Sequence, residues 1–426
     1  MRKLLSLWAL TLFAGFSQGQ TKYTRCYSDE HLKEEIRNNP ERGKSLEALN
    51  KKVDEIVAAR SAKNSPSNKI GPTTRTTTVY IPVVVNVVYN TPEENISDKQ
   101  IQSQIDVLNK DYSATNMELL KPKGYDFAGY YGVVANFNIQ FCLNTIVRTH
   151  TTLTSFSTNN AVKKTASGGQ DPLNPASMLN IWVCNLGGDL LGYAQFPKGA
   201  VATDGVVILY SAFGTKNAGA TADPYDEGRT ATHEIGHWFG LYHTFQGGCN
   251  KQNDKIDDTP PTGGPTFGCP GVGYMSTCKP SSLVQYMNYM DYTEDQCMYM
   301  FTMGQLARVD GFLSAGRAEY SLPSCPTITR NTSPNISHAV SDAEQVSVYP
   351  TVTAGSVTLT IPSNTTGKAD VSLLDQSGSP VQRRNVSLHT GKTQILLDVS
   401  TLPSGMYIIK VNRSNGGVET KKLIKQ

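Results

Sequence analysis

The 426-residue chain has little net charge, few tryptophans and few cysteines. Its 39 basic and 36 acidic residues leave a net charge of +3, which is too small to indicate nucleic acid or an anionic membrane as the main partner. Eight cysteines are too few for a small scaffold built on disulfides. With 38% apolar and 18% charged residues, the composition excludes a wholly disordered, collagen-like or coiled-coil protein.

The sequence also lacks a hydrophobic run long enough to span a membrane. Residues 4–16 are apolar, but a spanning helix needs about 20 such residues. Arg2 and Lys3 precede this run and small or polar residues come after it, which is the layout of a secretory signal peptide at 1–19. We therefore expect an exported protein, with no transmembrane segment, in a compartment where disulfides persist.

Residues 20–77 differ in composition from the rest of the chain. Residues 28–60 are rich in Glu, Lys, Leu and Ala, which predicts one or two solvated helices. Residues 61–78 are rich in Ser, Asn, Pro and Thr, which is typical of an exposed linker. A small helical segment joined by such a linker to a larger body indicates a removable prosegment, although a plain N-terminal extension has the same pattern.

Residues 78–322 form the predicted body, and their patterns favour an α+β fold. Residues 97–111 have apolar positions at helical spacing, with Ser97 as N-cap and Gln100 placed to complete a capping box. Strand patterns lie around this helix and after it, at residues 80–89, 137–144, 179–185 and 205–210.

A linker at 323–343 leads to a C-terminal domain at 344–426. This domain shows short strand patterns separated by turn signals, which predicts a non-catalytic β-sandwich. The seven expected strands are 346–349, 356–361, 370–374, 380–388, 393–399, 405–411 and 418–424.

Three of the seven histidines, His233, His237 and His243, lie within eleven residues. On a helix His233 and His237 are one turn apart on one face, so both imidazoles can reach one metal ion. Gly240 permits a left-handed turn that brings His243 back as the third ligand. Three nitrogen ligands leave the fourth position of a Zn²⁺ ion open for water, and Glu234 beside it would be the general base. A helix that carries histidines by chance, or a closed structural zinc site, would have no use for Glu234.

The motif His-Glu-x-x-His-x-x-Gly-x-x-His at 233–243 is the metzincin signature. Residues 78–320 resemble the pappalysin family of metzincins, at 190–197, 229–243, 248–249, 268–270, 288–292, 297–298 and 301–305. The resemblance implies a zinc metalloendopeptidase made as a zymogen. Its fold would have an upper α/β half and a lower irregular half, pinned by disulfides, around a cleft.

The resemblance also implies roles for residues near the methionine turn. Met290 would be the apolar base beneath the zinc ion, and Tyr292 would donate a hydrogen bond to the oxyanion, unless it is simply a packed tyrosine. Asp295, rather than Glu294, would line a specificity pocket for cleavage before Arg or Lys. Basic residues at 60, 63, 69 and 75 would then allow self-processing.

Further implied features concern cysteines and calcium. The family pairing is Cys249–Cys278 and Cys269–Cys297, although four cysteines allow three pairings. Clustered oxygens at Asp254, Asp257 and Thr259 (with Asp258) would hold structural Ca²⁺, or form an ordinary acidic turn.

Cys26 stands alone near the start of the prosegment. Its thiolate could take the fourth zinc position, a cysteine switch of the kind that metzincin proenzymes use. A disulfide to Cys142, Cys184 or Cys325, or Asp29 as the blocking group, remain alternatives.

The segments 405–411 and 421–426 resemble the sorting domain that Bacteroidetes-type bacteria use for type IX secretion. The expected partners are therefore this outer-membrane machinery and protein or peptide substrates, and the expected location is extracellular or at the cell surface. A substrate-binding sandwich is the alternative for this domain. For the whole chain the alternative is an adhesion or binding protein whose metalloprotease site is vestigial.

Overall fold

The computed structural model describes residues 23–63, 77–116, 133–250, 254–271, 273–320 and 324–325, and in the C-terminal part 346–349, 352–363, 366–375, 379–389, 391–413 and 418–425. The expected signal peptide at 1–19 lies outside these residues. The chain divides into two compact units, residues 1–330 and 331–426. Among the described residues, no helix combines the length and apolar character that crossing a bilayer requires.

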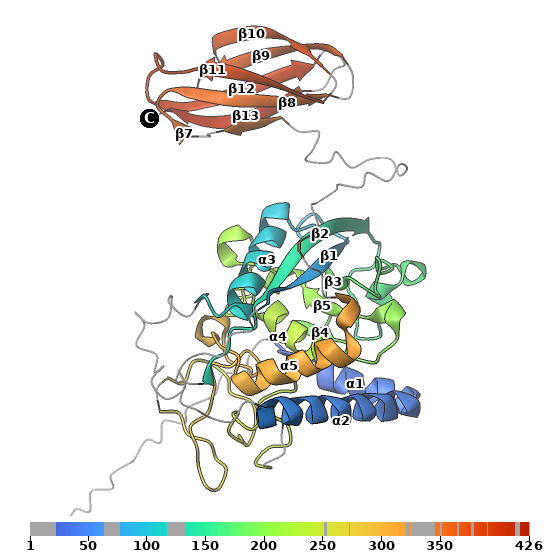
Figure 1. The fold of residues 1–426 in the computed structure, drawn as a ribbon. Coiled ribbons are helices and arrows are strands. Elements are labelled where there is room, and N and C mark those ends of the chain that lie inside the picture. The colour runs from blue at the N-terminus through green and yellow to red at the C-terminus, as the bar shows by residue number, and fades with distance from the viewer. Residues whose placement is uncertain are drawn as a thin grey trace, which may run out of the picture. The chain divides into compact units, whose positions relative to one another are not determined.

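The part of the first unit that carries the predicted catalytic motif, residues 77–325 (the catalytic unit), is built on a five-stranded sheet with the order β2-β1-β3-β5-β4 (Figure 1). Four strands are parallel, and the short edge strand β4 runs antiparallel to β5. The central strands are buried along their length, as their near-continuous apolar sequences predict. The strands are β1 (Val79–Tyr89), β2 (Ile139–His150), β3 (Leu179–Cys184), β4 (Gly192–Ala194) and β5 (Val206–Leu209).

Two helices, α3 (Asp98–Tyr112) and α4 (Arg229–Trp238), pack against the main apolar core of this sheet. The predicted N-cap of α3 is present, because Ser97 Oγ accepts a hydrogen bond from the Gln100 backbone N–H. The predicted capping box is wrong: the Gln100 side chain donates instead to the carbonyls of Tyr210 and Phe213, which ties α3 to the chain after β5.

The chain after α4 has little regular structure until α5 (Met303–Gly316), and disulfides hold it. Cys249 is bonded to Cys278 and Cys269 to Cys297, the two pairs that the family resemblance implied. A third disulfide, Cys142–Cys325, ties residue 325 to β2, three residues beyond the boundary expected at 322. Short 3₁₀ turns complete the unit: η4 (Ala161–Lys163), η5 (Thr165–Ser167), η6 (Val201–Thr203), η7 (Tyr210–Ala212), η8 (Lys216–Ala218), η9 (Asp295–Cys297) and η10 (Ala318–Tyr320).

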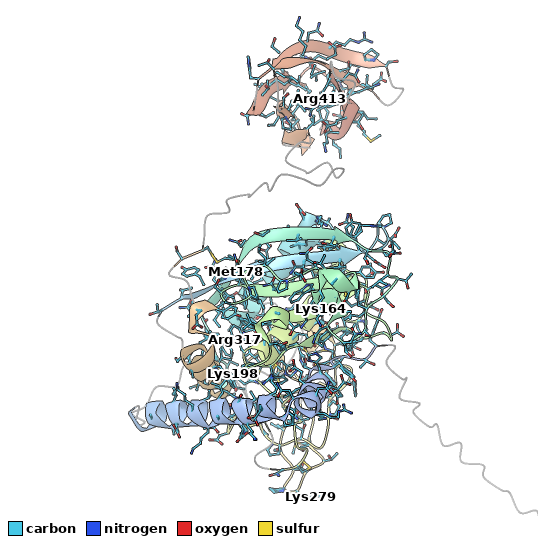
Figure 2. All side chains as sticks on the ribbon, turned by 90° about the vertical axis from the view of Figure 1, so that its right-hand side faces the viewer. Lys164, Met178, Lys198, Lys279, Arg317 and Arg413 are labelled. Atoms are coloured by element: carbon cyan, nitrogen blue, oxygen red, sulfur yellow. A yellow bond between two sulfur atoms is a disulfide. The ribbon has the colours of Figure 1, made fainter. Side chains whose placement is uncertain are left out.

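A buried ion pair fixes the end of α5 to the rest of the catalytic unit. Arg317, the residue after this helix, is labelled in Figure 2, and its two terminal nitrogens donate to the Asp204 carboxylate at 2.6 and 2.9 Å. Its Nε donates to the carbonyl of Trp238, the last residue of α4, at 2.9 Å. These contacts hold α5 against the end of α4 and so help to fix the surface that α5 presents to other parts of the chain.

The N-terminal segment forms two helices, α1 (Ser28–Asn38) and α2 (Pro40–Lys63), and both pack on the catalytic unit. Figure 1 shows α2 lying alongside α5. Just before α1 the chain is extended. Thr24 pairs with Leu190 in a parallel bridge, and the Tyr27 N–H donates to the carbonyl of Gly192, the first residue of the edge strand β4.

The C-terminal unit consists of two sheets that enclose one apolar core. Their orders are β10-β9-β12-β13-β7 and β11-β8-β6. All seven expected strands are present, and the two-residue strand β7 is an addition. The elements are β6 (Ser347–Tyr349), β7 (Val352–Thr353), β8 (Ser356–Ser363), β9 (Gly367–Leu374), β10 (Pro380–Leu388), β11 (Gly391–Asp398), β12 (Gly405–Arg413) and β13 (Val418–Lys425).

Candidate metal centre

The helix α4 and the turn after it bring three imidazoles together. The Nε2 atoms of His233, His237 and His243 lie 3.0–3.2 Å from one another. His233 and His237 are one helical turn apart, and Gly240, with φ +89°, makes the left-handed turn that returns the chain to His243. A side chain at Gly240 would also collide with the Phe312 ring.

The outer nitrogens of the three rings fix their orientation. His233 Nδ1 lies 2.7 Å from the Tyr289 carbonyl oxygen, and His237 Nδ1 lies 2.8 Å from that of Leu241. His243 Nδ1 lies 3.1 Å from an Asp29 carboxylate oxygen of α1. Each Nδ1–H therefore donates outward, and each Nε2 lone pair points to the common centre, as in histidines that bind a metal.

Cys26 completes this group. Its sulfur and the three ring nitrogens all lie within 4.8 Å of one another, and in the part of the chain that the structure describes no other cluster of His, Cys, Asp and Glu has this form. Burial and the neighbouring rings lower the pKa of His237 to about 3, so that ring is neutral. Burial and the Glu234 carboxylate raise the pKa of Cys26. A thiolate in this place needs a cation, and the donor set therefore fits a metal ion.

Glu234 lies beside the centre and is buried. Its Oε2 accepts a short hydrogen bond of 2.6 Å from Ser28 Oγ and lies 3.5 Å from the Cys26 sulfur. Its Oε1 has no hydrogen-bond partner among the described residues. Burial raises the pKa of Glu234 to about 7, which suits a group that accepts and returns a proton near neutral pH.

The methionine turn passes beneath α4. A side chain at Gly236 would meet the Met290 sulfur at 2.4 Å, so that sulfur packs directly against the helix between the two histidines. Two residues on, the Tyr292 ring lies 4.9 Å from the His243 ring between centroids and 4.8 Å from Phe245. Burial, with the nearby Cys26 and Glu234, raises the pKa of Tyr292, so its hydroxyl stays protonated as a donor.

Asp295 holds the side chain of Arg25, the residue before Cys26. Arg25 Nη2 lies 3.2 Å from Asp295 Oδ1, although the hydrogen does not point at that oxygen. Arg25 Nη1 donates to Thr230 Oγ1 at 2.6 Å, and the guanidinium lies 4.8 Å from the centre of the Tyr225 ring. Both charged side chains are buried, so this ion pair is shielded from water.

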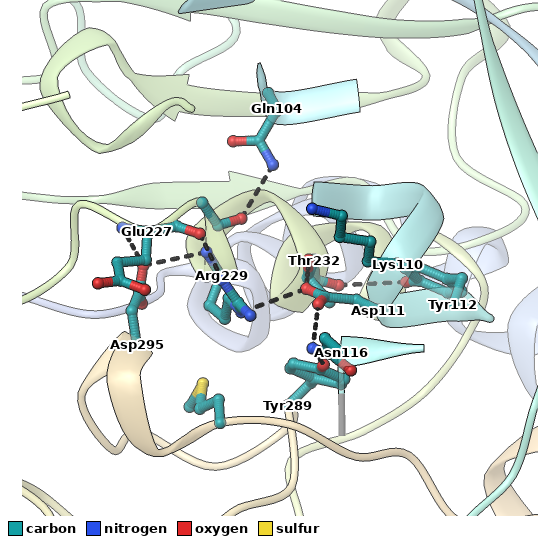
Figure 3. Close-up of polar contacts among 12 residues, drawn as sticks. Gln104, Lys110, Asp111, Tyr112, Asn116, Glu227, Arg229, Thr232, Tyr289 and Asp295 are labelled. Carbon is teal, nitrogen blue, oxygen red and sulfur yellow. Dashed lines mark hydrogen bonds and ion pairs between the residues drawn. The ribbon is translucent and has the colours of Figure 1, made fainter. Parts of the chain in front are cut away.

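The backbone at the start of α4 and just before it positions Asp295 (Figure 3). Asp295 Oδ2 accepts hydrogen bonds from the backbone N–H groups of Glu227 and Arg229, each at 3.0 Å. The Arg229 guanidinium lies 3.4 Å from an Asp111 oxygen. Burial opposes the charge of Arg229, but Asp111 and the other neighbouring acids hold its pKa above the ordinary value.

Asp254, Asp257 and Asp258 do not form a group of three acidic ligands among the described residues. Asp254 Oδ2 instead accepts a hydrogen bond from Thr259 Oγ1 at 2.7 Å, and Asp258 caps the start of α5 through the Gly304 N–H. Calcium binding therefore stays a prediction.

Four contacts were missed by sequence reasoning: Ser28 with Glu234, Arg25 with Asp295 and Thr230, and Asp29 with the outer nitrogen of His243. Asp29 was expected only as a rival blocking group. The alternative disulfides of Cys26 are absent, because Cys142 is bonded to Cys325 while Cys26 and Cys184 are free and buried. For the Arg25 contacts the sequence held one signal: Arg25 directly precedes Cys26, so its side chain must lie near the site that the thiol reaches.

Comparison with known families matches two parts of the chain. Residues 170–314 match the peptidase family described as pregnancy-associated plasma protein-A, whose members are pappalysins. Residues 347–426 match the secretion system C-terminal sorting domain. Extracellular metalloprotease 1 of Coccidioides posadasii is 36% identical over 229 residues, which are 52% of this chain and 71% of that protein. An extracellular metalloprotease of Pyricularia oryzae is 37% identical over 229 residues, 52% of this chain and 70% of its own length.

Solved structures of metalloproteases are also similar to this chain. Mature mirolysin of Tannerella forsythia in complex with a cleaved peptide is 43% identical, with a TM-score of 0.54, and the match covers 58% of this chain and 97% of mirolysin. A promirolysin mutant is 38% identical, with a TM-score of 0.60, over 70% of this chain and 97% of promirolysin. These likenesses confirm a metzincin fold and a secreted metalloendopeptidase made in latent form, with a tail for type IX export. The chain belongs to the pappalysin family of metalloproteases.

Proposed function

We propose that this chain is a zinc endopeptidase that cuts before arginine, and also before lysine, and that Cys26 keeps it latent. The observation that supports this proposal best is the position of Arg25 and Cys26. The thiol lies at the histidine cluster while the neighbouring guanidinium lies against Asp295 and Thr230. In this proposal the prosegment blocks the metal centre with Cys26 and the arginine-binding pocket at Asp295 with Arg25.

His233, His237 and His243 would hold the ion, which when bound supplies Lewis-acid polarisation of the scissile carbonyl. Glu234 takes a proton from the attacking water and passes it to the leaving amine, a role that fits its position 3.5 Å from the sulfur that completes the histidine cluster. The Tyr292 hydroxyl donates to the oxygen that becomes negative. With the prosegment in place, Ser28 Oγ donates to Glu234 Oε2, so one of the two carboxylate oxygens is already engaged.

Cleavage mapping tests the proposal with two variants of the activated enzyme. Glu234→Ala shows which cuts depend on the general base. Asp295→Asn keeps one oxygen for the two backbone N–H groups but turns an amide toward the substrate arginine. Charge-assisted hydrogen bonds contribute about 1.5–3 kcal/mol, so we expect cleavage before Arg to fall roughly 10- to 150-fold.

Metal content and melting temperature of both variants serve as controls for folding. Cuts that persist in Glu234→Ala would argue against the mechanism. Cuts whose preference for Arg is the same in parent and Asp295→Asn would remove the assignment of Asp295 but keep the protease.

A further inference from the structure

The catalytic unit also binds the prosegment at a second place, on the face of α5 that packs against α2, where none of the four residues of the metal cluster takes part. Leu49 and Val53 of α2 are buried there against Phe312. The surface is shaped for this helix by two glycines: a Cβ at Gly311 would lie 2.7 Å from a Val53 methyl, and one at Gly316 would lie 3.2 Å from a Leu49 methyl. Close packing of this kind places the apolar side chains of α2 in full van der Waals contact with α5.

A buried cation adds a polar contact on the same surface. Arg308 of α5 is 2% exposed, and its Nη2 donates to Asn50 Oδ1 at 2.6 Å while its Nη1 lies 3.3 Å from Asp54 Oδ1. Asn50 Nδ2 in turn donates to the Tyr242 hydroxyl at 3.2 Å. Departure of α2 would exchange both side-chain partners of the Arg308 guanidinium for water, while its Nε keeps the Gly240 carbonyl at 3.1 Å. Hydrogen bonds to a charged group are favourable net of this exchange, which disfavours departure.

A second apolar contact continues this surface toward the metal centre. Leu32 of α1 and Leu46 of α2 cover Phe196, whose ring lies 5.1 Å from the His237 ring and 5.3 Å from that of Tyr242 between centroids. The Arg42 guanidinium donates to the Phe196 carbonyl at 2.9 Å. None of these contacts involves Cys26, and every prosegment residue that makes them lies before residue 64.

We propose that the α5 surface formed by Arg308, Gly311, Phe312 and Gly316 is a docking site for α2 that holds the prosegment independently of the metal centre. A chain cut within residues 64–76 therefore stays latent, because the severed prosegment remains bound as a separate inhibitory chain. Activation needs a second event that removes α2 from α5. The inhibitory part rests on the proposed function, whereas the docking part does not.

The test uses the full chain with a recognition sequence for a site-specific protease in place of residues 68–74, which yields a severed zymogen on cutting. Leu49→Asp places a carboxylate at the α2–α5 contact, and Ala48→Asp places one at the adjacent exposed position as a matched control. Glu234→Ala is added for the binding measurement so that self-cleavage does not interfere. Size-exclusion chromatography and the dissociation rate of a labelled prosegment are then measured.

We expect both pieces of the parent and of Ala48→Asp to elute together, and those of Leu49→Asp to separate, with binding at least about 30-fold weaker. Val53→Ala is a milder second variant in case Leu49→Asp impairs folding of the uncut chain, and it should weaken binding in the same direction. Separation of the parent pieces would overturn the proposal, as would equal binding by Leu49→Asp, Val53→Ala and the control.

With Glu234 restored, the severed parent should remain inactive on an arginine-containing peptide, and severed Leu49→Asp should become active. Activity of the severed parent while its pieces stay together would refute inhibition by the docked prosegment. If Leu49→Asp releases its prosegment but stays inactive with metal bound, the docking site stands and the proposed function fails.

Discussion

His31 of α1 should make docking of the prosegment weaker in acid. The ring is 3% exposed and lies 5.0 Å from the Tyr193 ring, with Asn160 Nδ2 3.0 Å from its Nε2. Its Nδ1 has no hydrogen-bond partner among the described residues. Burial, together with the positive charges of Lys163 and Arg42, lowers the pKa of His31 from 6.5 to about 3.

The direction of the effect is set by this pKa. A lowered pKa means that the docked prosegment binds fewer protons than the free one, so docking is strongest above pH 6.5 and weakens as the pH falls toward 3. At pH 5, about 1.5 units below its free pKa, His31 must lose a proton when the prosegment docks. This costs about 2 kcal/mol, which corresponds to roughly 30-fold weaker binding than at pH 7.

The dissociation constant of the severed prosegment, measured between pH 7 and pH 5, tests this value. His31→Gln can still accept from Asn160 but does not titrate, so its binding should vary far less over this range. Metal content is measured in parallel, because acid also protonates the histidine cluster. Equal pH slopes for the parent and His31→Gln would refute the role of His31.

Three more predictions concern the centre and its surroundings. Cys26→Ala should process itself faster than the parent, whereas Cys184→Ala, which removes the other buried free thiol, should not; zymogen lifetimes on gels compare them, and equal lifetimes would exclude the switch. Gly236→Ala should lower stability by about 1–3 kcal/mol and weaken metal binding, because the new methyl meets the Met290 sulfur at 2.4 Å; a denaturant melt with metal titration measures both, and unchanged values would contradict this packing. A chelator selective for Ca²⁺ should lower the melting temperature, because the prediction places that ion at residues 254–259; an unchanged melting temperature would refute the predicted calcium site.

The metal centre was predictable from sequence because its geometry is local. Histidines one helical turn apart must share a face, and the left-handed turn at Gly240 comes within three residues of the second one. The strands of the C-terminal unit were predictable for a similar reason, since alternation and turn signals are short-range patterns. These inferences needed no knowledge of tertiary packing.

The contacts of the prosegment were not predictable in the same way. Ser28 reaches Glu234 across 206 positions of sequence, and Arg308 reaches Asn50 across 258. No periodicity links such pairs, and Gly311 or Gly316 indicates a helix contact only when the facing helix is known. The Gln100 side chain shows the same limit, because tertiary carbonyl acceptors compete with the local capping box and here they are preferred.

One short stretch of prosegment, residues 25–29, meets four functional groups of the site. Arg25 reaches Asp295, Cys26 the histidine cluster, Ser28 the general base and Asp29 the outer nitrogen of His243. The backbone pairing of residues 24–27 with 189–192 sets the register of this stretch, and the start of α1 at Ser28 directs the last two side chains. Contacts that share one backbone register are coupled, so single substitutions along it should not have additive effects on latency. Docking of α2 on α5 adds binding energy from outside this register, which is why removal of the thiol alone should shorten latency rather than abolish it.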